Sequence, residues 1–149
     1  MKPFSFGLEK ILALRVHYEN EAKIELGKAV SVLADLESKL FALSRERERA
    51  AASQFNPGNN AAQIQQYMYY LLRLDYDKGI LLEETAMAEL KVEEARNAYL
   101  EASKDRKVLD KLKEKRQKEY FKKALLTEAI MLDDISSCAR ARNTVSEMV

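Results

Sequence analysis

The sequence predicts an all-α fold, a long antiparallel two-helix coiled-coil hairpin with a longer second helix. Apolar residues recur at seven-residue spacing on both sides of a single break at residues 54–60. The composition is 47% hydrophobic and 33% charged with only 4 Gly and 2 Pro, which is typical of long helices. We therefore expect one coiled-coil domain over residues 1–149, with helices at about 5–53 and 61–142 joined by a turn at 54–60.

The break has the sequence QFNPGNN, in which Pro57 and Gly58 stand between asparagines. Proline fixes φ and lacks a backbone N–H, glycine accepts positive φ, and asparagine tolerates the left-handed region. These residues predict the point at which the chain reverses. The two arms that they separate are unequal, about 45 and about 80 residues long.

The first arm carries the pattern of a coiled-coil seam, because its apolar residues alternate in steps of four and three over about six heptads. The apolar seam positions are Leu8, Leu12, Ala22, Leu26, Ala29, Leu33, Leu36, Leu40, Leu43 and Ala50, and the polar ones are Arg15, Glu19 and Arg47. The repeat resumes in the second arm at Ile64, Tyr67, Leu71, Leu74, Lys78, Leu81, Thr85, Ala88, Val92, Ala95, Tyr99, Ala102, Arg106 and Leu109.

The two seams can be docked on each other by residue number. If the chain folds back at residue 57, facing positions have numbers that sum to about 114. In this register Leu26 faces Ala88, and the Arg15 side chain lies over the ring of Tyr99. The first arm ends before the second, so about 30 residues of the second arm have no partner within the chain.

Two stretches contain more than a bare hairpin needs. Residues 67–82 are rich in Tyr and Leu, which predicts a protein-binding patch; the alternatives are a third helix that packs on them or a Tyr-rich surface without a partner. Residues 105–123 hold nine Lys or Arg and four Asp or Glu. This basic block is interpreted as a solvated helical face, a docking surface for an acidic protein, or a nucleic-acid site.

The residues for catalysis are nearly absent. The sequence has no phosphate-binding glycine loop, no zinc motif and no cysteine pair. The single His17 is expected to be a surface residue, and the single Cys138 an inert thiol that cannot form an internal disulfide. We therefore expect no enzyme activity, no cofactor and no metal. Without a signal peptide or a membrane span, the chain is expected to be soluble and intracellular.

Several segments resemble the flagellar export protein FliJ family of the type III secretion apparatus. The opening matches F-x-F-x-L-x-x-I-L-x-L-R at residues 4–15, and AYLEASKDRKVLDKLKEKR stands at residues 98–116. The short polar turn and the LDDI segment at residues 132–135, followed by Arg140 and Arg142, add to the similarity.

The resemblance implies a hairpin like the central stalk of rotary ATPases. Its open end would insert into the hexameric ring of the export ATPase (FliI), and it would also contact the export gate protein FlhA and export chaperones. The implied ATPase-binding residues are Leu8, Leu12, Lys111, Lys113, Lys115 and Arg116. The implied gate-binding residues are Tyr67, Tyr70, Leu71 and Leu74.

The leading interpretation is thus a non-enzymatic component of flagellar protein export. It would promote assembly of the ATPase ring and ATP hydrolysis, link the ring to the gate, and lie at the cytoplasmic face of the cell membrane through its partners. The alternatives are a coiled-coil arm that binds nucleic acid through the basic block and a generic dimerising scaffold.

Overall fold

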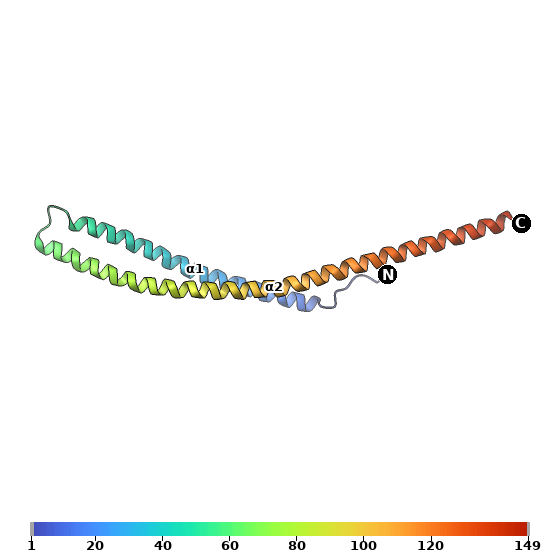
Figure 1. Cartoon of the computed structure of the whole chain (residues 1–149), viewed down its shortest axis with the longest axis horizontal. Helices are drawn as coiled ribbons and strands as arrows, with labels where there is room; N and C mark the ends of the chain where they lie inside the picture. The colour runs from blue at the N-terminus through green and yellow to red at the C-terminus, as the bar shows by residue number, and fades with distance from the viewer. Residues whose placement is uncertain (1, 149) are drawn as a thin grey trace. The chain divides into compact units, whose positions relative to one another are not determined.

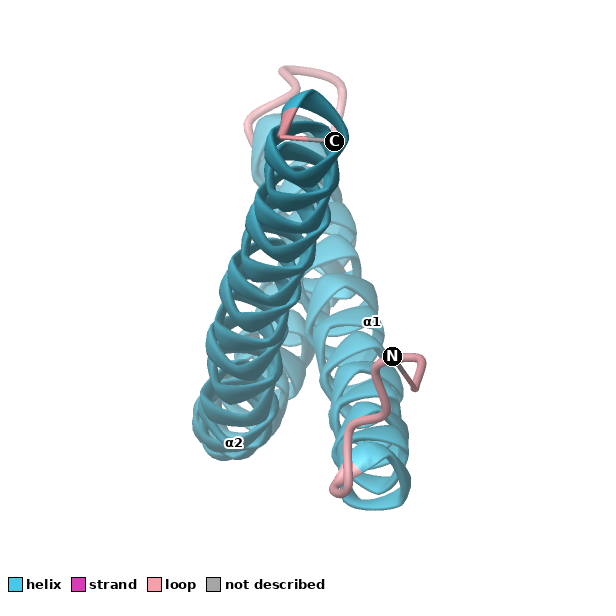
Figure 2. Ribbon diagram, turned by 90° about the vertical axis from the view of Figure 1, so that its right-hand side faces the viewer, coloured by secondary structure: helices cyan, strands magenta, loops and turns pink. Residues whose placement is uncertain are grey.

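The computed structural model describes residues 2–148, which form two helices, α1 (Glu9–Gln54) and α2 (Ala61–Glu147) (Figure 1). No strand occurs within these described residues (Figure 2). The helices pack against each other as a hairpin with a longer second helix, so the predicted fold class is confirmed. The chain divides into two compact units, the hinge unit (residues 17–103) and the open-end unit (up to Val16, and from Lys104 onward). The single domain over residues 1–149 stays a prediction.

Both helix boundaries at the open end differ from the predicted ones. α1 begins at Glu9 rather than near residue 5, and residues 2–8 are not helical. Glu9 lies in the first turn of α1, where the positive end of the helix dipole stabilises its negative charge. α2 continues to Glu147 rather than to about residue 142, and the Thr144 hydroxyl donates to the carbonyl oxygens of Arg140 and Ala141 in this last part of the helix.

The chain reverses through asparagine side chains. The Asn59 side-chain amide donates to the carbonyl oxygens of Ser53 at 2.6 Å and Gln54 at 3.4 Å, and so caps the end of α1. Asn60 and Gln63 exchange two hydrogen bonds of 2.9 and 3.0 Å between side chain and backbone, and this capping box starts α2. No described residue has a positive φ, so Gly58 is not used in the left-handed conformation that the sequence suggested.

The predicted seam positions are confirmed with three exceptions. Every predicted position of both arms is buried or half-buried except Arg47, Ile64 and Lys78, which are exposed. In each helix the half-buried position is one residue earlier than predicted. It is Glu46 instead of Arg47 in α1, and Asp77 instead of Lys78 in α2. The interface between two helices is thin, so the buried apolar residues of the described chain are few: Phe6, Leu12, Ala50, Leu74, Ala88 and Val92.

The predicted register of the two helices is wrong by about one helical turn. Arg15 pairs with Asp105 at 3.0 Å rather than lying over Tyr99. In the hinge unit, Ala88 lines one groove together with Ala29 rather than with Leu26. The chain does not fold symmetrically about residue 57, and the Asn59 side chain ties the turn to the end of α1. Residues 61–66 of α2 are therefore exposed, and pairing begins at Tyr67.

Candidate functional site

Residues 2–8, the N-terminal strap, lie along α2 in the open-end unit. The Tyr120 hydroxyl donates to the Lys2 carbonyl oxygen at 2.5 Å, and the rings of Phe4 and Tyr120 are 5.6 Å apart. Phe6 is only 7% exposed, and the Arg116 guanidinium lies 5.7 Å from the centre of its ring. The strap thus extends the apolar seam beyond the first turn of α1.

Ion pairs fix α1 against α2 in the same unit. Lys113 contacts Glu9 at 2.8 Å, and Arg15 contacts Asp105 at 3.0 Å. Each is partly exposed to solvent, so each contributes well under about 1 kcal/mol to stability. Their effect is mainly to set which residues face each other at this end.

The segment of α2 without a partner is shorter than predicted. The strap contacts α2 at Tyr120, and Ala124 is the last half-buried residue of α2, so residues 125–148 are all exposed. Several large apolar side chains in this segment face solvent: Leu125, Leu126, Ile130, Met131, Leu132 and Ile135. A shallow cavity of about 620 Å³ at its start is lined by Phe121, Ala124, Leu125, Thr127, Glu128 and Met131.

The residues that the resemblance assigned to the ATPase do not share one surface. Leu12 is buried, with 7% of its surface exposed, and Leu8 is half-buried. Lys113 is held by Glu9, and Arg116 lies on Phe6. Of the six, Lys111 and Lys115 are the ones that are exposed without an ion pair or ring stacking within the described chain. The role of all six stays a prediction.

Sequence reasoning missed a row of lysines on the outer side of the basic block. Lys107, Lys111, Lys115, Lys118 and Lys122 follow one another in steps of four, four, three and four residues and are all exposed. That spacing was visible in the sequence and is the helical signal for a common face. A groove of about 490 Å³ along this row is lined by four of these lysines together with Glu114 and Glu119.

One of these acids is strongly coupled to the row. Glu114 accepts a hydrogen bond of 2.6 Å from the Lys118 ammonium. This hydrogen bond, together with the charges of Lys118 and Lys111, lowers the pKa of Glu114 below its ordinary value. Glu114 is therefore a carboxylate at neutral pH and neutralises part of the row at its edge.

The residues that the resemblance assigned to the gate lie mainly in the seam of the hinge unit. Leu74 is buried, with 6% of its surface exposed, and Tyr67 and Leu71 are half-buried. Tyr70 is exposed, and its hydroxyl donates to Glu46 at 2.9 Å, which raises the pKa of the tyrosine. Gate binding by these four residues stays a prediction.

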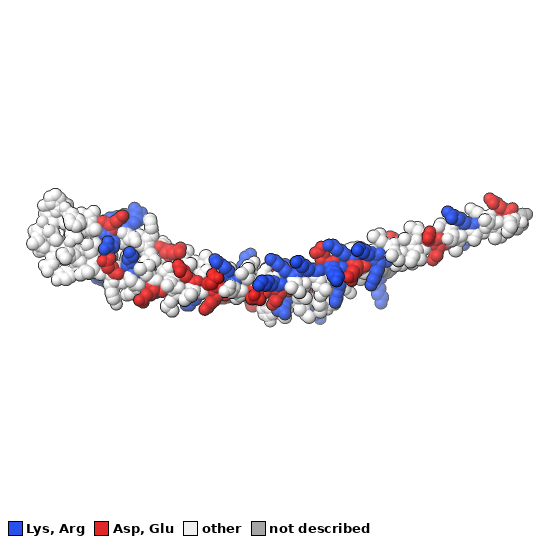
Figure 3. Space-filling model, viewed as in Figure 1, with Lys and Arg blue, Asp and Glu red and all other residues white. Residues whose placement is uncertain are grey.

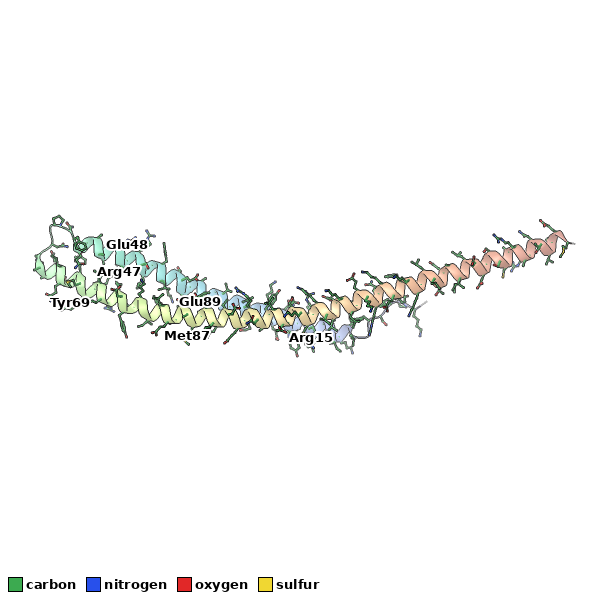
Figure 4. All side chains as sticks on the ribbon, viewed as in Figure 1. Arg15, Arg47, Glu48, Tyr69, Met87 and Glu89 are labelled. Carbon is green, nitrogen blue, oxygen red and sulfur yellow. The ribbon has the colours of Figure 1, made fainter. Side chains whose placement is uncertain are left out.

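A different set of side chains forms the exposed surface near the turn, which we call the hinge patch. Tyr69 is 64% exposed, and Figure 4 shows it on the side of α2 away from α1. The members of the hinge patch are Phe55, Met68, Tyr69, Leu72 and Tyr76. No third helix covers them within residues 2–148, so that alternative is wrong.

The surface around the turn is uncharged. No Lys, Arg, Asp or Glu occurs between Arg49 and Arg73. Figure 3 shows the turn end in white, whereas the blue Lys and Arg side chains gather over the basic block of α2. A partner at the turn would therefore be recognised by aromatic and amide groups rather than by ion pairs.

Other kinds of site find no support in residues 2–148. No helix there is both long and apolar enough to cross a membrane, and no three potential metal ligands cluster. Cys138 is an exposed free thiol. The expected lack of catalytic activity stays a prediction.

The chain was also compared with known proteins. Residues 4–144 match the family described as "Flagellar FliJ protein", which is most of the 149 residues. No curated protein and no solved structure matched. The family match and the helical hairpin agree with each other, so this chain belongs to the flagellar FliJ protein family, the coiled-coil components of flagellar type III protein export.

Proposed function

We propose that this protein acts as a stalk for the export ATPase. Its open-end unit binds the hexameric ring of FliI, favours assembly of the ring and raises its rate of ATP hydrolysis. The hinge unit contacts the export gate protein FlhA, and export chaperones bind the same protein. These partners hold it at the cytoplasmic face of the cell membrane.

The observation that supports this proposal is the construction of the open-end unit. The strap, α1 and two ion pairs hold α2 in place up to Ala124. Residues 125–147 then continue as an exposed helix with large apolar side chains. A helix of this length and composition gains stability when a partner covers it, and a ring with a central opening fits such a shape.

The test is to mix the purified protein with the ATPase and to measure ATP hydrolysis and the population of hexamers. We expect both to rise. The variant Leu132→Ser with Ile135→Ser removes apolar surface that is exposed in the free protein, so it should fold normally but lose most of the stimulation.

The matched control is Leu90→Ser, which replaces an equally exposed leucine in the hinge unit. It should stimulate the ATPase like the unmodified protein. If the unmodified protein changes neither hydrolysis nor assembly, the proposed function is wrong.

A further inference from the structure

The lysine row forms a single face of α2. At 100° per residue, Lys107, Lys111, Lys115, Lys118 and Lys122 lie within an arc of about 80°. We call this arc the lysine face. The side chains that contact α1 and the strap, among them Lys113, Arg116 and Tyr120, project from roughly the opposite side of the helix. The lysine face is therefore turned away from the rest of the open-end unit.

The lysine face keeps most of its charge. Lys107, Lys115 and Lys122 form no ion pair with another described residue, whereas Lys118 is paired with Glu114 at 2.6 Å. Glu114 and Glu119 project from the two edges of the arc rather than from its centre. The acids of the basic block thus border the lysine face but do not neutralise it.

The choice of residues indicates what kind of polyanion fits. The two arginines of the block are engaged elsewhere, Arg106 with Asp110 and Arg116 on the Phe6 ring. Arginine is the residue that best matches phosphate geometry, and bases stack on aromatic rings, but the lysine face has neither. Flexible ammonium groups spread over about 23 Å of helix suit carboxylates scattered on a protein surface.

We propose that the lysine face docks on a carboxylate-rich surface of the partner ATPase ring. This inference rests on the proposed function and changes the residues that carry it. Lys107, Lys118 and Lys122 join Lys111 and Lys115 as contact residues. Lys113 and Arg116 act instead as positioning residues, because they hold α1 and the strap.

The experiment compares two variants that each lose three positive charges. The first variant combines Lys107→Gln, Lys115→Gln and Lys122→Gln. The second variant is the control and combines Lys23→Gln, Lys78→Gln and Lys91→Gln, which replace exposed lysines of the hinge unit. Helicity and Tm confirm that both are folded. Affinity for the purified ATPase is then measured from low to high salt, with a short DNA duplex as a second probe.

We expect the first variant to bind the ATPase about tenfold more weakly at low salt and with a flatter salt dependence, while the second matches the unmodified protein. Equal affinity and equal salt dependence for the first variant would refute the lysine face while leaving the proposed function standing. Tight DNA binding that the first variant loses would show that the face takes nucleic acid instead. If the unmodified protein does not bind the ATPase at all, the proposed function and this inference are both refuted.

Discussion

The two units of this protein cover the same helix in different ways. In the hinge unit α2 packs on α1 through small and branched side chains, and the turn end carries no charge. In the open-end unit a non-helical strap, aromatic rings and ion pairs cover α2, and its outer side presents lysines. The same hairpin thus presents an uncharged surface at its turn and a lysine-rich surface at its open end.

The largest expected effect on stability comes from truncating a buried side chain in the seam of the hinge unit. Leu74→Ala removes one of the few buried side chains of this thin interface, so it should lower the free energy of unfolding by about 2–4 kcal/mol. The Tm should fall by about 5–10 °C. Thermal unfolding followed by circular dichroism measures this.

The control for Leu74→Ala is two residues away. Leu72→Ala truncates a leucine that is 63% exposed on the hinge patch, so its Tm should stay near that of the unmodified protein. Equal losses of Tm at the two positions would mean that α1 and α2 do not pair along this seam in solution.

A smaller and more local effect is expected at the open end. Phe6→Ala removes the ring that lies under Arg116 and is buried against α2. The strap should detach, and amides in residues 2–8 and around Tyr120 should exchange with solvent at least about tenfold faster, while the hinge unit keeps its protection. Hydrogen exchange resolved by segment measures this.

Phe41→Ala is the comparison for Phe6→Ala, because Phe41 is an exposed phenylalanine in the hinge unit. Its exchange pattern should match the unmodified protein. Unchanged exchange at Tyr120 in Phe6→Ala would show that the strap does not depend on Phe6 for its position.

How far the sequence predicts this molecule depends on the kind of interaction. The seam positions followed from seven-residue spacing, because burial of one helical face is a local pattern. The register did not follow, since the seven-residue spacing repeats along both helices and does not say which repeats face each other. A shift of about one turn kept most of the seam positions but changed the partner of Arg15 from Tyr99 to Asp105.

The site residues were harder to predict for a related reason. Lys113 and Arg116 belong to the same basic block as Lys111 and Lys115, and their contacts with Glu9 of α1 and Phe6 of the strap distinguish them. Residues 5–8 were expected to be helical, so nothing indicated that Phe6 would lie against Arg116. In contrast, the spacing of the outer lysines alone shows that they share one face of the helix. This inference does not require knowing which segment packs on the helix.

The smallest expected effect is a difference between the two units in how their stability depends on pH. In the hinge unit Asp75 accepts hydrogen bonds of 2.5 and 3.3 Å from Arg47 across the helix pair, which lowers the pKa of Asp75 below its ordinary value of 3.8. Because this pKa is lower in the folded than in the unfolded state, the ionised carboxylate stabilises the folded protein at pH values above about 3.8. This contribution is lost as the pH falls below about 3.8. In the open-end unit the lowered pKa of Glu114 reflects a pair within one helix turn, so acid there weakens only local helix.

The variant Asp75→Asn tests this difference directly. At pH 7 it should melt slightly below the unmodified protein, and the gap should narrow as the pH falls below about 3.8, since the contribution of the ionised carboxyl is lost in acid. Glu114→Gln serves as the comparison, with a gap at pH 7 that is smaller still, because no contact between α1 and α2 is lost. A gap for Asp75→Asn that persists unchanged in acid would mean that its charge pairing with Arg47 contributes nothing, and that apolar contacts and hydrogen bonds alone hold α1 and α2 together in the hinge unit.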